Sequence, residues 1–293
     1  MEHLFKGAGV ALITPFKKNL SIDFNALETL VEEQITSGTD YLVALGTTAE
    51  TPTLSADEQK EVINCIKAKV NKRVPIMLGL GGNDPVKVCQ TIKGTNFDGI
   101  DGILSVTPYY NRPPQAGLIA YYKSIAAACP VPVVLYNVPS RTGVNMESAT
   151  SVAIAKACPN VIAVKEASGE SSQVAKMAKH GPAHFAVISG DDVLTLPIIS
   201  VGGIGVISVA SNALPGQMAE LVHLALDGRL AEARQLHQRL VDLFKLLFRE
   251  GNPAGVKALM EIMGKTNSNV RLPLCAASSE LYKDLEEELK RVL

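Results

Sequence analysis

Short apolar runs recur along the chain, and each is bounded by glycine, proline, asparagine or another turn-forming residue. They are apolar throughout rather than alternating, which is typical of strands buried on both faces of a parallel sheet. We predict eight strands, in GVALITP, DYLVALG, VPIMLGLG, GILSVTP, VPVVLYNVP, VIAVKEA, FAVISG and GVISVAS.

Amphipathic stretches with helix start and stop signals lie between these runs. Ser55 and Glu58 form a capping-box pattern before EQKEVINCIKAKV, and Asp84-Pro85 opens a stretch that closes at Gly94. Strand and helix alternate about every 20–35 residues, which predicts repeated βα units closing into a (β/α)₈ TIM barrel. The alternative is an open doubly wound sheet, whose usual phosphate-binding pattern is G-x-G-x-x-G. The nearest stretch in this chain, GLGGND, has Asp84 in place of the last glycine.

The pattern changes to long helical segments after Asn212. PGQMAELVHLALDGRLAEARQLHQRLVDLFKLLF and GVKALMEIMG have helical periodicity, and no further strand follows them. We therefore predict a catalytic barrel over residues 1–225 and a C-terminal helical segment over residues 226–293, for which an oligomer contact is one use.

Composition and charge indicate a globular protein with small-molecule partners. The chain has 293 residues, 47% of them hydrophobic and 19% charged, and its formal net charge of −1 gives no electrostatic case for nucleic acid or an anionic membrane. The five cysteines are scattered without C-x-x-C pairs, and the five histidines lack ligand spacing, so neither disulfides nor a metal site is predicted. Pro15 interrupts the apolar N-terminal run GAGVALITPF, so we expect a cytoplasmic protein without a signal peptide.

Candidate chemistry lies at the carboxyl ends of the predicted strands, where barrel enzymes place their active sites. Lys165 ends the sixth strand, and an uncharged amine in an apolar pocket can form a Schiff base with a ketone. Tyr136 ends the fifth strand, and with Thr47 it could relay protons. Arg141 is a two-pronged donor for a carboxylate, and the backbone N–H groups of Thr47-Thr48 are another carboxylate-binding feature.

Each of these residues also has an ordinary structural interpretation. A lone strand-end lysine often extends its amine into water, and a buried tyrosine often bonds a backbone group. Thr47-Thr48 can be a plain loop start, Arg141 can be solvated, and Asp191-Asp192 are expected to cap a helix rather than bind a cation. The combination, rather than any single residue, favours Schiff-base chemistry.

Taken in order, GTTAE, VTPYYNRP, YNVPSRTG, VKEASG, SGDD and GVISVASN resemble the dihydrodipicolinate synthase family, among the pyruvate-dependent Schiff-base aldolases related to N-acetylneuraminate lyase. The resemblance covers the whole chain. It implies condensation of pyruvate with L-aspartate-4-semialdehyde to 4-hydroxy-tetrahydrodipicolinate, the first committed step of diaminopimelate and lysine biosynthesis. It also implies no cofactor and a homotetramer built as a dimer of dimers.

The resemblance assigns a role to each matched residue. Lys165 would form the Schiff base, and Thr47, Tyr136 and Tyr110 would relay protons, with Tyr110 reaching in from a neighbouring subunit. Thr48 would hold the pyruvate carboxylate and Arg141 that of the aldehyde. Gly190 and Ile207 would offer backbone contacts near the lysine.

The sequence also departs from the family pattern. Ala49 replaces a usual glycine, and it would strain the loop if its φ were positive. Six positions correspond to the lysine feedback site of inhibited relatives, namely Thr51, Ala56, Gln59, Asn83, Lys87 and Tyr109, and of these Asn83 and Tyr109 match the residues found there. Among them Ala56 and Gln59 stand where histidines are often found, and Lys87 stands where a glutamate would pair with the ligand's amino group. Since two cations repel, we expect weak or no inhibition by lysine.

Two other functions compete with this hypothesis. One is N-acetylneuraminate lyase or a related sugar-acid aldolase, which shares the lysine and the tyrosine. Arg141 argues against it, because a sugar acceptor needs hydroxyl-binding groups rather than a second carboxylate clamp. The more distant alternative is a non-catalytic barrel that binds a keto acid.

Overall fold

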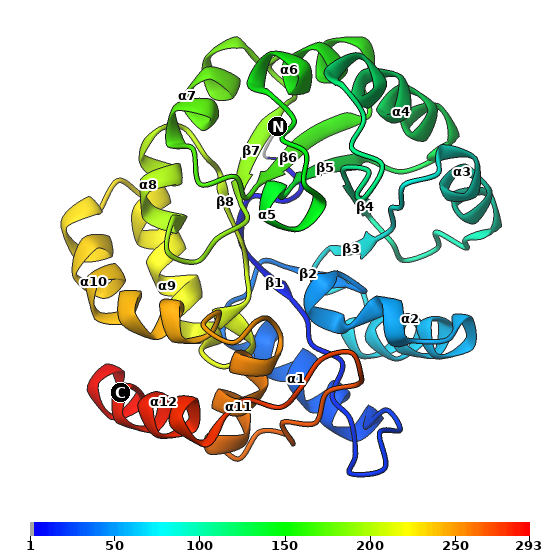
Figure 1. Ribbon diagram of the computed structural model, residues 1–293. Helices are drawn as coiled ribbons and strands as arrows, with labels where there is room; N and C mark the ends of the chain where they lie inside the picture. Colours follow the sequence, from blue (N-terminus) through cyan, green and yellow to red (C-terminus); the bar gives the residue numbers. More distant parts are fainter. Residues whose placement is uncertain (1–2) are drawn as a thin grey trace. The chain divides into compact units, whose positions relative to one another are not determined.

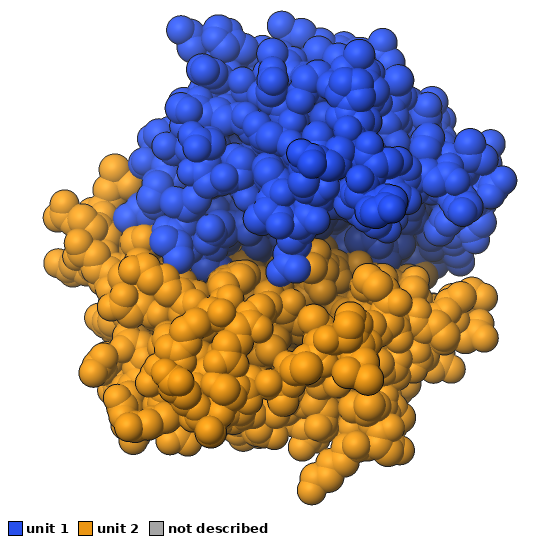
Figure 2. All heavy atoms as spheres, viewed as in Figure 1, with its two compact units in different colours: residues 1–6, 75–207 blue, residues 7–74, 208–293 orange. Residues whose placement is uncertain are grey.

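The computed structural model describes residues 3–293. The chain divides into two compact units, one made of residues 1–6 and 75–207 and the other of residues 7–74 and 208–293 (Figure 2). The first contains Lys165, Tyr136 and Arg141, and the second contains Thr47 and Thr48.

Eight parallel strands follow one another in chain order around a closed barrel (Figure 1). Most strand residues are fully buried, because a parallel sheet covered by helices hides both of its faces. This confirms the predicted TIM barrel and excludes the open sheet. The strands are β1 (Gly7–Ala11), β2 (Tyr41–Ala44), β3 (Ile76–Gly79), β4 (Gly102–Val106), β5 (Val133–Asn137), β6 (Val161–Glu166), β7 (Ala186–Ser189) and β8 (Gly205–Ser208).

In the first unit, helices alternate with the strands from β3 to β7, and α3, α4, α6 and α7 pack side by side outside them (Figure 1). The predicted start of α3 is confirmed, because the Asp84 carboxylate accepts hydrogen bonds from two backbone N–H groups of the first turn and Pro85 occupies the first helical position. The helices are α3 (Pro85–Gly94), α4 (Gln115–Ala128), α5 (Pro139–Thr142), α6 (Ser148–Ala157), α7 (Ser171–His180) and α8 (Thr195–Ser200).

The second unit holds β1, β2 and all helices after β8. The predicted capping box is confirmed at the start of α2, where Ser55 and Glu58 each bond the other's backbone N–H. The helical elements are α1 (Phe24–Thr36), α2 (Ala56–Val70), α9 (Pro215–Leu226), α10 (Leu230–Leu246), α11 (Ala254–Ile262), α12 (Ser279–Val292) and the short 3₁₀ turns η1 (Thr47–Ala49), η2 (Thr51–Thr53) and η3 (Ala210–Asn212).

The predicted C-terminal helices are present, and α12 shows why they fold. Its buried residues Leu281, Leu285, Leu289 and Val292 recur every three or four positions and so share one face. Burying each of these side chains stabilises the fold by about 1.5–3 kcal/mol. The expected division between barrel and helical segment at residue 225 stays a prediction.

The structure also bears on cysteine pairing and on membrane association. The five cysteines are all free thiols. None of the helices formed by residues 3–293 has the length and apolar character needed to span a bilayer.

Candidate active site

Lys165 and Tyr136 lie beside each other at the ends of β6 and β5. The two residues are register partners in the parallel pair, and the Lys165 Nζ lies 4.5 Å from the centre of the Tyr136 ring. Both are nearly buried, with exposed fractions of 5% and 8%. The Lys165 amine makes no hydrogen bond with residues 3–293. It is therefore a shielded nitrogen next to a phenol.

Gly190 provides the space in which the Lys165 side chain lies. Its backbone N–H donates to the Glu166 carbonyl over 2.8 Å, which brings the end of β7 against β6. A Cβ atom at this position would lie 2.8 Å from the Ala167 Cβ, 3.1 Å from the Glu166 carbonyl oxygen and 3.2 Å from the Lys165 Cε. Glycine is required here because the Ala167 Cβ, the Glu166 carbonyl and the Lys165 stem leave no room for a side chain. Ile207 is buried in β8, as expected for a residue that offers only its backbone.

The expectation that Asp191-Asp192 cap a helix is wrong. Helix α8 begins at Thr195 after Leu194, and no side chain caps it. The Asp191 carboxylate instead accepts a hydrogen bond from the Val193 N–H at 3.0 Å, because aspartate readily bonds the backbone two residues on and so forms a turn. Burial raises the pKa of Asp191, while the Val193 N–H and the positive charge of Lys165 act in the opposite direction.

A buried polar network that the sequence analysis did not assign lies one residue beyond the Tyr136–Lys165 pair. The Asn137 Nδ2 donates to both oxygens of Glu166, over 3.0 and 3.1 Å. Glu166 also accepts from the Ser168 N–H at 2.7 Å and from the Gln173 Nε2 at 2.9 Å. Since successive strand residues face opposite sides, the network supports the strand ends from behind. In the sequence, the only indication of this network is that two polar residues follow one another at the ends of two neighbouring strands.

Arg141 and Tyr110 are the exposed catalytic and substrate-binding candidates of this unit. Arg141 lies in the short helix α5, and its guanidinium has no partner among the residues that the structure describes. Tyr110 is 90% exposed and has a left-handed backbone with φ of 72°. The Asn111 N–H closes a tight turn around it by donating to the Tyr109 carbonyl. Such strained turns are found at functional sites, where other contacts sustain them.

Thr47 and Thr48 form the start of η1 in the second unit. Thr47 is exposed, whereas Thr48 is buried and its Oγ1 accepts a hydrogen bond from the Asn252 Nδ2 at 2.9 Å. Ala49 does not have the positive φ that would strain it, because the left-handed residue is the next one, Glu50, with φ of 56°. The alanine side chain is simply buried in the 3₁₀ turn.

Three of the candidate lysine-binding positions lie in each unit. In the first unit, the Asn83 Nδ2 donates to the Tyr109 carbonyl. The Nζ of the exposed Lys87 lies 3.8 Å from the Asp84 Oδ2. In the second, the Thr51 Oγ1 bonds the Gly46 carbonyl and the Gln59 Nε2 bonds the Leu54 carbonyl. Ala56 is the exposed first residue of α2. These polar side chains support their own loops.

A metal centre receives no structural support. Within the part of the chain that the structure describes, no group of three or more His, Cys, Asp or Glu residues is placed to hold a metal ion. The chemistry that the site offers is that of a buried amine, hydroxyl groups and a guanidinium.

Comparison with known proteins places this arrangement in a family. The chain matches the model of the Dihydrodipicolinate synthetase family over residues 4–292. It is 50% identical over 287 residues to a 4-hydroxy-tetrahydrodipicolinate synthase of Parabacteroides distasonis, covering 98% of this chain and 97% of that one.

Similar solved structures are also dihydrodipicolinate synthases. A monomeric dihydrodipicolinate synthase variant is 38% identical with a TM-score of 0.96, covering 99% of this chain and 97% of that one. The enzyme of Cyanidioschyzon merolae with lysine bound is 37% identical with a TM-score of 0.94, covering 100% of both chains.

The fold and the relatives define a barrel enzyme of the lyase class. The chain belongs to the dihydrodipicolinate synthetase family. The resemblance found in its sequence motifs is thereby confirmed, together with the synthase activity that the family implies.

The crowding at Gly190 predicts the effect of a single methyl group. In Gly190→Ala the new Cβ must displace Ala167 or the Lys165 stem, and a displacement of about 1 Å at a reacting group is enough to lower turnover at least about tenfold. Steady-state kinetics with pyruvate, beside thermal unfolding, measure this. Gly94→Ala is the matched control, since its Cβ meets nothing within 4 Å. Wild-type turnover in Gly190→Ala would show that the close approach has no catalytic consequence.

Proposed function

We propose that this chain condenses pyruvate with L-aspartate-4-semialdehyde through a Schiff base at Lys165. The observation that carries the proposal is the buried Lys165 amine, which lies over the Tyr136 ring and makes no hydrogen bond with residues 3–293. Membership of the family and the synthase names of the relatives support the same substrates.

The proposed reaction has four steps. The Lys165 nitrogen attacks the ketone carbon of pyruvate, and loss of water gives a protonated imine. Loss of a methyl proton gives an enamine, whose carbon attacks the aldehyde carbon of the semialdehyde. The amino group of the semialdehyde then attacks the imine carbon and displaces the lysine. One water is released overall, and the product is the cyclic 4-hydroxy-tetrahydrodipicolinate.

Proton transfer in these steps requires hydroxyl groups close to the imine. The Lys165 Nζ lies 4.5 Å from the centre of the Tyr136 ring, which supports the assignment of Tyr136 as the donor and acceptor of protons during imine formation. Thr47 and Tyr110 continue the relay in the proposal, as the family resemblance implies. Gly190 and Ile207 contribute backbone contacts.

Carboxylate recognition is assigned to Thr48 and Arg141. The Asn252 amide occupies a lone pair of the Thr48 hydroxyl, so the hydroxyl hydrogen remains to be donated to the carboxylate of pyruvate. Arg141 has an exposed guanidinium without a partner in the described chain, which suits a bidentate contact with the carboxylate of the semialdehyde.

The proposed steps require no metal and no organic cofactor. The protonated imine withdraws electrons from the adjacent methyl group, so the lysine nitrogen itself supplies the activation. We propose the cytoplasm as the place of action, where the free thiols stay reduced.

For the assembly we propose a homotetramer built as a dimer of dimers. The 90% exposure and strained backbone of Tyr110 support this, because a relay residue that lies in water needs a second surface to enclose it. One structural relative is a monomeric variant, so membership of the family does not decide the assembly.

Turnover and trapping test the reaction. With pyruvate we expect turnover with L-aspartate-4-semialdehyde and none with N-acetylmannosamine, and borohydride should trap a pyruvate adduct in the wild type but not in Lys165→Ala. Mass spectrometry of the trapped protein measures the adduct. Turnover only with the sugar would move the chain to the lyase branch and leave Arg141 without its role. Absence of an adduct in the wild type would support a barrel that only binds keto acids.

A complementation experiment tests the assignment of Tyr110. Tyr110→Phe removes the hydroxyl group and should lower kcat by about 100-fold or more, the usual contribution of a proton-transfer group. Mixed with Lys165→Ala, it should regain activity, because a Tyr110 from one chain completes the Lys165 site of the other. Random pairing in a two-fold dimer restores up to about a quarter of the sites. Mixed dimers without regained activity, or a fully active wild-type monomer, would refute the role across the interface.

Lysine sensitivity tests the regulatory hypothesis. Lys87 presents a positive charge where inhibited relatives pair the amino group of the ligand, so we expect weak inhibition by lysine or none. Lys87→Glu should increase sensitivity, whereas Lys93→Glu, on the exposed side of the same helix, should not. Inhibition constants from steady-state assays with added lysine measure this. Wild-type inhibition in the low micromolar range contradicts the hypothesis.

A further inference from the structure

Glu50 is a buried carboxylate immediately after the Thr47–Ala49 turn. Its backbone is left-handed, with φ of 56°, a conformation that residues other than glycine and asparagine rarely adopt. An unfavourable backbone of this kind persists only where surrounding contacts hold it.

Two donors from the C-terminal part of the chain bind the two oxygens of Glu50. The Lys257 Nζ lies 2.5 Å from Oε1, and the Arg271 N–H donates to Oε2 over 2.8 Å. The side chains of Glu50 and Lys257 are both 0% exposed. Water therefore cannot replace either partner, and the pair holds the carboxylate in one orientation.

Lys257 itself is held from three sides. Besides Glu50, its Nζ donates to the Asn269 carbonyl at 2.9 Å and lies 4.3 Å from the centre of the Phe16 ring. Burial lowers the pKa of Lys257 to about 8, against the opposing attraction of Glu50. At neutral pH the amine is therefore still an ammonium group, and the contact with Glu50 is an ion pair.

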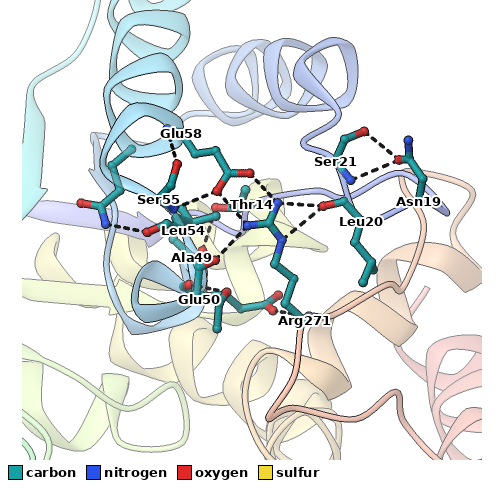
Figure 3. Close-up of polar contacts among 12 residues, drawn as sticks. Thr14, Asn19, Leu20, Ser21, Ala49, Glu50, Leu54, Ser55, Glu58 and Arg271 are labelled. Carbon is teal, nitrogen blue, oxygen red and sulfur yellow. Dashed lines mark hydrogen bonds and ion pairs between the residues drawn. The ribbon is translucent and has the colours of Figure 1, made fainter.

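Arg271 is fixed by its guanidinium, as Figure 3 shows. It donates to the Leu20 carbonyl at 2.8 Å, to the Thr53 carbonyl at 2.9 Å and to both oxygens of Glu58. Arg271 lowers the pKa of Glu58 to about 2, so this carboxylate is ionised at neutral pH. The backbone N–H that reaches Glu50 therefore comes from an anchored residue.

The turn that precedes Glu50 is also held by hydrogen bonds from side chains in other parts of the chain. The Thr14 Oγ1 donates to the Ala49 carbonyl at 2.8 Å, and the Asn252 Nδ2 donates to Thr48. Thr48 and Glu50 thus each bond to a residue more than 200 positions away in the chain. The turn cannot rotate without breaking a buried polar contact.

We propose that Glu50 is a positioning residue: its buried ion pair with Lys257 and its bond from the Arg271 backbone set the direction in which Thr47 and Thr48 present their polar groups. This inference rests on the proposed function, in which Thr48 holds the pyruvate carboxylate. Glu50 itself touches no substrate.

Kinetics of Glu50→Gln and of the double variant Glu50→Gln/Lys257→Met test the inference. Glu50→Gln leaves the Lys257 ammonium without a buried counter-charge, whereas the double variant removes both charges and so recovers thermal stability. In both, the KM for pyruvate should rise at least about tenfold, because displacing the Thr48 hydroxyl by about 1 Å is sufficient. The KM for the semialdehyde should change far less. Glu61→Gln, an exposed position on α2, is the matched control.

A merely structural role for Glu50 gives a different result. In that case the double variant recovers stability and also has the wild-type KM for pyruvate, which overturns the inference. Borohydride trapping distinguishes failure of the inference about Glu50 from failure of the proposed function. If the wild type forms the Lys165 adduct and the variants form it at the same pyruvate concentrations, only the inference about Glu50 fails. If the wild type forms no adduct, the proposed function fails and the inference fails with it.

Discussion

The pairing register between β5 and β6 is the constraint on which the candidate site depends. Because strand residues alternate between the two faces of the sheet, placing Tyr136 opposite Lys165 also places Asn137 opposite Glu166 on the other face. The first pair supplies a phenol and an amine, and the second supplies the buried hydrogen bonds behind them. A slip of one residue would place Tyr136 opposite Val164 or Glu166 instead of Lys165, and it would turn the amine to the other face of the sheet.

Local features of the sequence were sufficient to predict the strands and several helix starts. Apolar runs, the Ser55–Glu58 pattern and Asp84-Pro85 act through neighbouring residues, so their meaning does not depend on the rest of the fold. The family motifs added the candidate site residues. Asp191 was misjudged because an aspartate before a helix and an aspartate in a turn look alike in sequence.

The contacts that could not be predicted join distant parts of the chain. Nothing near Thr48 or Glu50 in the sequence points to Asn252 or Lys257, and only the fold brings them together. This separates two kinds of candidate site residue. Lys165 is carried by a strand, whose hydrogen-bonded backbone already fixes it, whereas a residue in a loop such as Thr48 depends on long-range support.

That dependence has a consequence for biosynthesis. A chain emerging from the ribosome exposes the Thr47–Glu50 segment long before Asn252, Lys257 and Arg271 have been made, and folding proceeds largely from the N-terminus during synthesis. The Glu50 carboxylate therefore has no Lys257 ammonium to pair with until most of the protein has been translated. Truncated products that stop before residue 252 would retain the Lys165 strand but lack every C-terminal contact of the threonine turn.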